Sequence, residues 1–193
     1  MTPLTLDPKK SALVLIDLQK GIVGRPLAPR TGTEVVQNAS RLVARFRALG
    51  ATVVLVRVSF QPDFRDCLSP PADAATQFNA AAFPPDWADL VPELGPKPGD
   101  IVIVKRQWGA FYGTELDLQL RRREVRTIVL GGIATNIGVE STARSAHEHG
   151  YAQVFVEDAM TSNTTEDHQF AVQRIFSRLG QVRSTEEVLA ALA

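Results

Sequence analysis

Residues with catalytic side chains stand directly after apolar runs in this sequence. Asp17 follows the run 12–16, Lys105 follows 101–104, and the stretch 131–140 follows 127–130 and leads into a helical pattern. A carboxylate and an ammonium at neighbouring strand ends can transfer a proton as a pair, and a helix N-terminus offers donors to developing negative charge. The spacing predicts an acid–base site, although either residue alone is equally well explained as a loop cap or a solvated strand end.

The elements that must position these residues are short apolar runs rich in Val and Ile. They are continuous rather than alternating, which is typical of parallel strands covered on both faces. The expected strands are residues 12–16, 52–58, 101–104, 127–130 and 153–156, with a weaker sixth strand at 181–183.

Helical periods lie between several of these strands. Apolar positions share one stripe from 34 to 49, ahead of Gly50, and a second helix spans 139–149, ahead of Gly150. Shorter patterns begin at Leu116 and after Thr164 and Ser184. Alternating strands and helices predict an α/β fold, a three-layer α/β/α sandwich around a parallel sheet, in which ligands bind at the carboxyl ends of the strands.

Length and proline usage describe the domain organisation. The chain has 193 residues, which suits a single domain spanning 1–193. Residues 61–100 hold eight of the 12 prolines and show no clear period. An insertion of that length is usually a lid, an oligomer contact or part of a site wall.

Charge and cysteine usage exclude several functions. Lys plus Arg and Asp plus Glu each number 21, so the net charge of +0 gives no field that would attract nucleic acid or an anionic membrane. The single cysteine, Cys67, excludes an internal disulfide and a multi-cysteine metal site. The first residues lack the apolar stretch of an export signal, so we expect a cytoplasmic protein with no membrane segment.

Three spaced motifs together resemble the isochorismatase-like, or cysteine hydrolase, family over about residues 12–162. The resemblance implies a Rossmann-like, six-stranded parallel sheet with helices on both faces. It also implies an Asp–Lys–Cys triad that includes Asp17 and Lys105, and a non-proline cis bond between Ile133 and Ala134 that turns N–H groups of the segment up to Ile137 toward an oxyanion hole. The motifs are Asp17-Leu18-Gln19, then Lys105 with Trp108, Phe111, Gly113, Thr114 and Leu116, then Gly132-Ile133-Ala134-Thr135-Asn136.

The third triad position is where this sequence departs from that family. The nucleophilic cysteine falls at Gly138, which has no side chain, so thioester chemistry from this position is impossible. The isochorismatases proper also have glycine there and hydrolyse a vinyl ether by acid catalysis. By that analogy Asp17 is the general acid, and Lys105 pairs with Asp17 or with a substrate carboxylate. Burial favours neutral Asp17 and Lys105 favours its charged form, so both the protonation state and the substrate stay open.

Other residues have weaker claims to the site. Cys67 is expected to be a bystander thiol, because nothing near it would lower its pKa. The histidines His147, His149 and His168 are expected on solvated helix faces, and we expect no metal and no cofactor. The candidates for substrate binding are Gln19 from just behind the site, Thr135 and Asn136, and an aromatic wall of Trp108, Phe111 and Tyr112, which packing of the loop would explain equally well.

The sequence therefore predicts a hydrolase that acts on a small anionic or cyclic metabolite through Asp17 and Lys105, without a cysteine nucleophile. A non-catalytic binding or assembly protein that keeps the fold is the alternative from another class, and an amidase using Cys67 is a third. Since relatives commonly form dimers or larger homo-oligomers, we expect a homo-oligomer here, with no nucleic-acid partner.

Overall fold

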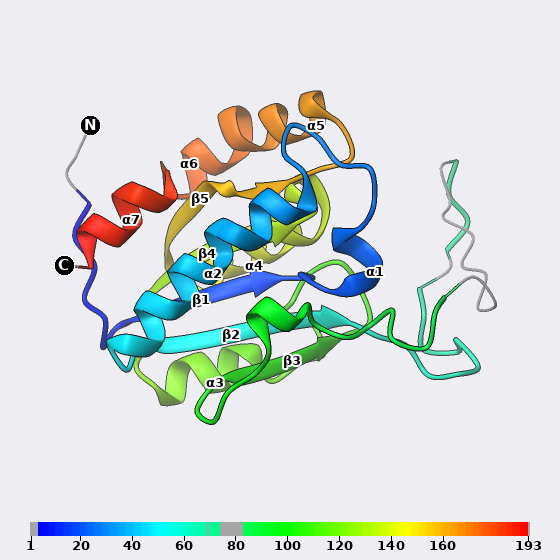
Figure 1. Ribbon diagram of the computed structural model, residues 1–193, viewed down its shortest axis with the longest axis horizontal. Helices are drawn as coiled ribbons and strands as arrows, with labels where there is room; N and C mark the ends of the chain where they lie inside the picture. The colour runs from blue at the N-terminus through cyan, green and yellow to red at the C-terminus, as the bar shows by residue number, and fades with distance from the viewer. Residues whose placement is uncertain (1–3, 69, 74–82, 193) are drawn as a thin grey trace.

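A computed structural model describes residues 4–68, 70–73 and 83–192 of the chain. Its centre is a sheet of six parallel strands in the order β3-β2-β1-β4-β5-β6 (Figure 1). The predicted parallel sheet is thus confirmed, including its sixth strand. The strands are β1 (Ser11–Ile16), β2 (Thr52–Val58), β3 (Ile101–Lys105), β4 (Thr127–Ile133), β5 (Ala152–Thr161) and β6 (Gln181–Arg183).

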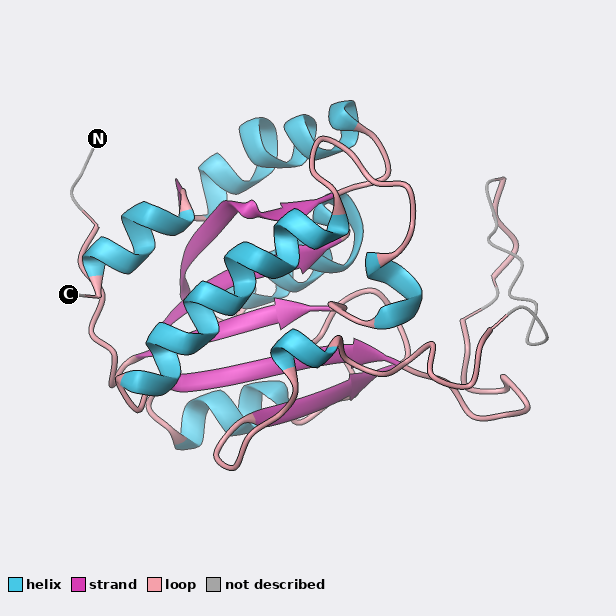
Figure 2. Cartoon of the chain, in the orientation of Figure 1, coloured by secondary structure: helices cyan, strands magenta, loops and turns pink. Residues whose placement is uncertain are grey.

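Helices cover both faces of this sheet (Figure 2). One face packs against α2 (Gly32–Ala48), the turn η2 (Pro92–Leu94) and α7 (Thr185–Ala191). The other face packs against α3 (Leu116–Arg122), α4 (Glu140–Glu148) and the π-helical turn η4 (Ala171–Phe176). The remaining short elements are α1 (Lys20–Val23), the π-helical turn η3 (Thr135–Val139), α5 (Thr165–Phe170) and α6 (Ser177–Leu179).

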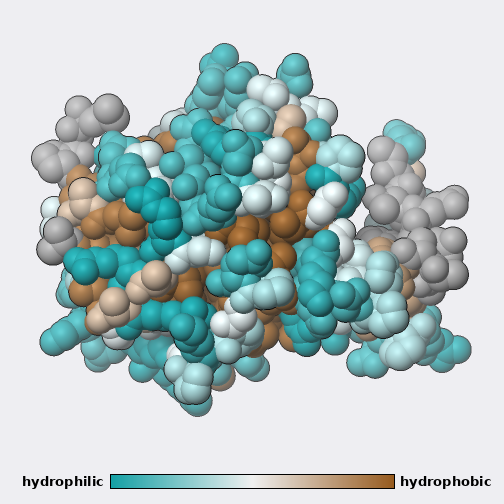
Figure 3. Space-filling view, viewed as in Figure 1, coloured by the Kyte–Doolittle hydropathy of each residue, from teal (hydrophilic) through white to brown (hydrophobic). Residues whose placement is uncertain are grey.

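The core lies on both sides of β1, all six of whose residues are buried. Ala12, Val14 and Ile16 belong to the apolar cluster under α3 and α4, whereas Leu13 and Leu15 belong to the cluster under α2. This explains why the run reads as continuously apolar. Figure 3 shows the outer surface on the α2 side, where hydrophilic side chains cover most of the face and apolar surface is visible between them.

Helix starts follow local capping chemistry. The Thr31 hydroxyl accepts a hydrogen bond from the Glu34 N–H, and the Glu34 carboxylate accepts one from the Thr31 N–H, so α2 begins two residues before the predicted start. Ser184 and Glu187 form the same reciprocal pair ahead of α7. Gly50 and Gly150 have φ of +63° and +80°, as left-handed positions after helices require.

The edge strand β3 departs from the prediction of strands covered on both faces. Its exposure alternates, and Val102 and Val104 are each 36% exposed. Within the described sheet, β3 is an edge strand, and the face of β3 that carries Val102 and Val104 is only partly covered by other elements. The residues that alternate with these two, from Ile101 to Lys105, are buried.

The described parts of the insertion 61–100 leave the carboxyl end of β2 and return past α1; residues 69 and 74–82 of the predicted insertion lie outside the described residues. The returning segment is hydrogen-bonded to the part of the chain that follows β1. Gln19 pairs with Leu90, and the N–H of Gly21 donates to the Trp87 carbonyl over 3.0 Å. Within the described ranges, no helix is long and apolar enough to cross a membrane.

Candidate active site

Asp17 and Lys105 meet at the carboxyl edge of the sheet. Asp17 directly follows β1, and its backbone turns out of the strand with φ of +53°, a conformation that Asp tolerates better than most residues. Lys105 is the last residue of β3, and β2 runs between the two strands. Their side chains are buried, and the Lys105 Nζ lies 2.7 Å from the Asp17 Oδ2. Parallel strands end at one edge, so residues 88 positions apart form an ion pair.

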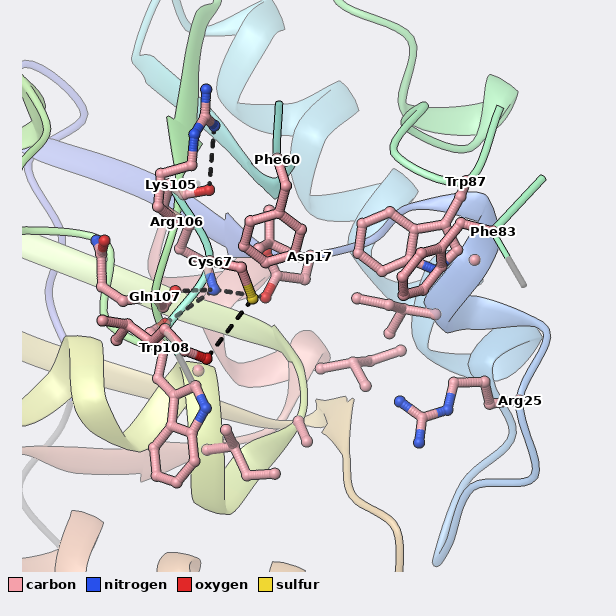
Figure 4. A pocket seen from close by; sticks show the side chains of 18 of the residues that line it. Asp17, Arg25, Phe60, Cys67, Phe83, Trp87, Lys105, Arg106, Gln107 and Trp108 are labelled. Atoms are coloured by element: carbon pink, nitrogen blue, oxygen red, sulfur yellow. Dashed lines mark hydrogen bonds and ion pairs between the residues drawn. The ribbon is translucent and has the colours of Figure 1, made fainter. Parts of the chain in front are cut away.

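All three donors of the Lys105 ammonium have acceptors. Besides the Asp17 Oδ2, it donates to the carbonyl oxygens of Gln107 over 3.1 Å and Trp108 over 2.8 Å. The ammonium is therefore fixed by the turn after its own strand, as Figure 4 shows. Of the two partners that the sequence left open for Lys105, the structure shows Asp17.

The two oxygens of Asp17 have different surroundings. Oδ2 is held by Lys105, while Oδ1 is buried and accepts no hydrogen bond from any described residue. Burial raises the pKa of Asp17 to about 6, even though the neighbouring ammonium of Lys105 and the backbone N–H of Val58 lower it. Burial is thus the stronger effect, and a proton is available on this carboxyl near neutral pH.

The segment 133–138 forms the other side of the site. The peptide bond between Ile133 and Ala134 is cis, and the chain then enters η3, whose C-terminal end leads into α4. Gly138 is buried in this turn. A Cβ placed on Gly138 would lie 3.3 Å from the Asp17 Oδ2 and 2.9 Å from the Ile16 Cγ2. A side chain at position 138 would therefore touch the acid directly, and in this chain that space holds no nucleophile.

A cavity of about 440 Å³ opens above these groups. Its floor consists of the residues at the strand ends and in the segment after β4, namely Asp17, Lys105, Ile133, Ala134, Ile137 and Gly138. The structure thus brings three predicted features to one cavity: the pair Asp17 and Lys105, the segment 133–137, and Gly138, which stands where the family has its nucleophile. The cavity has the volume of a site for a small metabolite.

The match to known proteins agrees with this geometry. The model of the Isochorismatase domain matches residues 11–187. The chain belongs to the isochorismatase family. The "Uncharacterized isochorismatase family protein YwoC" of Bacillus subtilis (strain 168) is 51% identical over 189 residues, covering 98% of this chain and 97% of that protein. An isochorismatase family protein from Burkholderia thailandensis superposes with a TM-score of 0.92 at 48% identity, over 97% of each chain.

More distant members of the isochorismatase family carry names that state an activity. The ureidoacrylate amidohydrolase RutB of Methylorubrum extorquens (strain DSM 6343 / CIP 106787 / DM4) is 33% identical, over 81% of this chain and 72% of that protein. The N-carbamoylsarcosine amidase from Thermoplasma acidophilum has a TM-score of 0.70 at 27% identity, over 92% of this chain and 97% of that one. Hydrolysis is thus the type of activity associated with this isochorismatase-family fold.

Three of the predicted binding residues do not line the cavity of this isochorismatase-family member. The buried Gln19 amide bonds instead to the N–H and carbonyl of Val58 and to the Trp87 carbonyl, over 2.9 to 3.2 Å. It therefore braces the end of β2 and the insertion. Thr135 and Asn136 turn away as well, the first to His168 and the second to Ser162. Their spacing placed them in the right segment, but the π-helical turn points their side chains elsewhere.

The predicted aromatic wall is wrong for two of its three members. Phe111 is buried against His149, with ring centroids 5.0 Å apart, and Tyr112 is 81% exposed and outside the cavity lining. Only Trp108 lines the cavity, and it is 65% exposed. The other aromatic lining residues are Phe60, Phe83 and Trp87, from the end of β2 and the insertion. The proline-rich composition signalled a possible site wall there, but not which residues would form it.

Cys67 also lines the cavity, which the sequence did not suggest. Burial and the neighbouring Asp66 raise the pKa of its thiol, and its Sγ lies 3.6 Å from the Leu68 carbonyl oxygen. A raised pKa keeps the sulfur protonated, which is the opposite of what a nucleophilic cysteine requires.

His168 is buried, contrary to the prediction of a solvated histidine. Its Nδ1 lies 2.9 Å from the Thr135 Oγ1, and burial lowers its pKa to about 4. The helical period placed His168 on α5 but did not show that α5 turns this face onto η3. No group of three His, Cys, Asp or Glu side chains in the described part of the chain could hold a metal ion.

Proposed function

We propose that this protein is a hydrolase in which Asp17 acts as a general acid and water, rather than an enzyme side chain, attacks the substrate. One observation carries the proposal: Asp17 lines the cavity with its Oδ1 buried and without a hydrogen-bond partner, while Lys105 holds the Oδ2 and Gly138 leaves the nucleophile position empty of any side chain. A carboxyl with a pKa of about 6 can supply a proton near neutral pH.

Hydrolysis of a vinyl ether fits these groups. Neutral Asp17 transfers its proton to the terminal vinyl carbon, and the electron pair of the double bond forms the new C–H bond. The resulting oxocarbenium ion accepts water at the carbon that bears the oxygen. The hemiketal then breaks into a ketone and an alcohol, and the proton released by water returns to Asp17. No step requires a thiol, in agreement with Gly138.

Lys105 serves as a positioning residue in this scheme. Its ammonium touches the Asp17 Oδ2 and two carbonyls of its own turn, so it has no donor left for the substrate. It fixes the carboxyl so that the Oδ1 is the free oxygen. It also stabilises the carboxylate that remains after proton transfer.

Replacing the acid tests this proposal directly. In Asp17→Asn, turnover of the vinyl ethers that the wild type hydrolyses should fall by about 10²–10⁴-fold, because the amide cannot deliver the proton. Asp63→Asn is the matched control, since Asp63 is exposed on the insertion and outside the cavity lining. Unchanged turnover in Asp17→Asn would remove Asp17 from the mechanism. A compound that raises the melting temperature of the wild type but is never consumed would favour a binding protein instead.

Amide hydrolysis through Cys67 is the second candidate, because Cys67 lines the same cavity and RutB relatives are named amidohydrolases. The raised pKa of the thiol argues against it. We expect Cys67→Ser to retain full activity toward any substrate of the wild type. Loss of activity in Cys67→Ser, with Asp17→Asn still active, would reverse the ranking of the two candidates.

A further inference from the structure

Three cationic side chains line the cavity, and two of them are paired. Lys105 pairs with Asp17, and the Arg106 Nε lies 2.5 Å from the Oδ2 of Asp66. The third cation, Arg25, has no ion pair with any residue that the structure describes, nor does its guanidinium form a hydrogen bond there. Arg25 is exposed, and it is the cavity cation whose donors have no acceptor in the described chain.

Arg25 stands on a well-fixed piece of backbone. It follows α1, whose first turn is closed by hydrogen bonds from the N–H groups of Ile22 and Val23 to the Gln19 carbonyl. The N–H of Arg25 itself donates to the Ile22 carbonyl over 3.2 Å. Figure 4 shows Arg25 reaching into the cavity from the side of Trp87 and Phe83, across from Lys105 and Trp108. Its backbone is thus tied to α1, whose first turn is closed on Gln19, the residue that also braces the end of β2 and the insertion.

An aromatic surface occupies the same side of the cavity. The Trp87 ring stacks on Phe60 with centroids 6.4 Å apart and contacts Phe83 at 4.5 Å. Gly21 makes this arrangement possible, because a Cβ at that position would lie only 1.9 Å from the Trp87 Cδ1. Flat aromatic rings offer a planar, apolar group both contact area and a defined orientation.

We infer that Arg25 is the specificity-determining residue of the cavity, and that it binds the carboxylate of a substrate whose planar, apolar part lies along Phe60, Phe83 and Trp87. This inference rests on the proposed function, since it describes the substrate of the same site. Lys105 cannot take this role because its three donors are occupied. A guanidinium binds a carboxylate through two parallel hydrogen bonds, and the donors of Arg25 are not used by any residue that the structure describes.

Calorimetric titration with matched probes tests the inference without requiring turnover. The probes are benzoate and phenylacetate, each compared with its neutral carboxamide. In the wild type, the carboxylates should bind more tightly than the carboxamides. Arg25→Met should weaken carboxylate binding by about tenfold and leave carboxamide binding unchanged, and Arg25→Lys should retain most of the affinity. Arg122→Met is the matched control, because Arg122 is exposed on α3 and outside the cavity lining.

The inference is wrong if the wild type binds carboxylates and carboxamides equally, or binds no carboxylate at millimolar concentration. It is also wrong if Arg25→Met weakens the binding of both kinds of probe equally, or if Arg122→Met weakens carboxylate binding as much as Arg25→Met does. Failure of the proposed function looks different. If carboxylates bind through Arg25 but no related compound is ever hydrolysed, the proposed hydrolase function is wrong and the role of Arg25 stands. If a substrate is hydrolysed and its KM is unchanged in Arg25→Met, the role of Arg25 is wrong and the hydrolase function stands.

Discussion

Two buried titratable side chains meet the segment 133–138 and its π-helical turn from different directions, and they behave in opposite ways. Asp17 faces Gly138 from the end of β1 and has its pKa raised to about 6. His168 bonds to Thr135 from α5 and has its pKa lowered to about 4. One physical cause, the penalty on a buried charge, acts on both, and it favours the neutral form in each case.

The surroundings decide what each neutral group can do. Asp17 lines the cavity and has one oxygen without a hydrogen-bond partner, so this residue borders the space that a ligand would occupy. His168 does not line the cavity, and it contacts Thr135, the first residue of η3. A shifted pKa is therefore a guide to function only together with a place in the cavity lining, and on that criterion Asp17 is the candidate for the acid and His168 is a structural support of the turn η3.

The largest expected effect comes from removing the counter-charge of the acid. Lys105→Met leaves the Asp17 carboxylate buried without an ammonium, so the free energy of unfolding at pH 8 should fall by about 3–5 kcal/mol. The loss should be smaller at pH 5, where the isolated carboxyl takes up a proton. Urea denaturation at the two pH values measures this.

The double variant Asp17→Asn, Lys105→Met is the control for this prediction. It leaves no buried charge at the site, so it should regain much of the lost stability. An equal loss at pH 5 and pH 8 in the single variant would mean that packing, rather than the charge of Asp17, explains the effect.

A smaller effect should separate the two groups by pH. Because the folded pKa of His168, about 4, lies below its usual 6.5, the unfolded chain binds more protons between these values, and His168 makes stability rise with pH across that window. The folded pKa of Asp17, about 6, lies above its usual 3.8, so its contribution makes stability fall as pH rises from 3.8 to 6. The two contributions, each about 3 kcal/mol, nearly cancel in the wild type.

Single substitutions should expose each contribution in denaturant titrations between pH 4 and pH 7. Relative to the wild type, Asp17→Asn should gain stability as the pH rises, and His168→Gln should lose it. The difference from the wild type removes the titration of all other groups. Parallel curves for the wild type and both variants would show that neither pKa is shifted by folding.

The smallest of these effects concerns the hydrogen bond between His168 and Thr135. Thr135→Val keeps the shape but removes the hydroxyl that bonds to the His168 Nδ1, so the free energy of unfolding should fall by about 1–2 kcal/mol. Benzoate affinity should stay unchanged, because Thr135 does not line the cavity. Loss of benzoate binding without loss of stability would contradict the support role and return Thr135 to the binding residues.

Strand ends were the most predictable part of the site. Continuous apolar runs predict parallel strands, and parallel strands end at one edge, so Asp17 and Lys105 follow from the sequence as neighbours. The motif around Ile133 and Gly138 likewise places the segment opposite the acid. Predictions of this kind depend only on residues close in sequence and on the topology that they impose.

The walls and supports were not predictable in the same way. Helical periodicity shows which residues of a helix share a stripe, but not what covers that stripe, so His168 read as solvated and Phe111 as a wall residue. The aromatic surface comes from the insertion, whose path past α1 depends on the Gln19 amide and on the absence of a side chain at Gly21.

By itself, the sequence determined the family, the parallel sheet, the choice of Asp17 and Lys105 as chemical groups at neighbouring strand ends, and the absence of a nucleophile at Gly138. The tertiary structure alone decided that the pKa of Asp17 is raised to about 6, that all three donors of Lys105 have acceptors, and that Arg25 lines the cavity without an ion pair to any described residue. The reason is that desolvation and charge balance depend on which segments, distant along the chain, surround a group, whereas residue type and strand register are local.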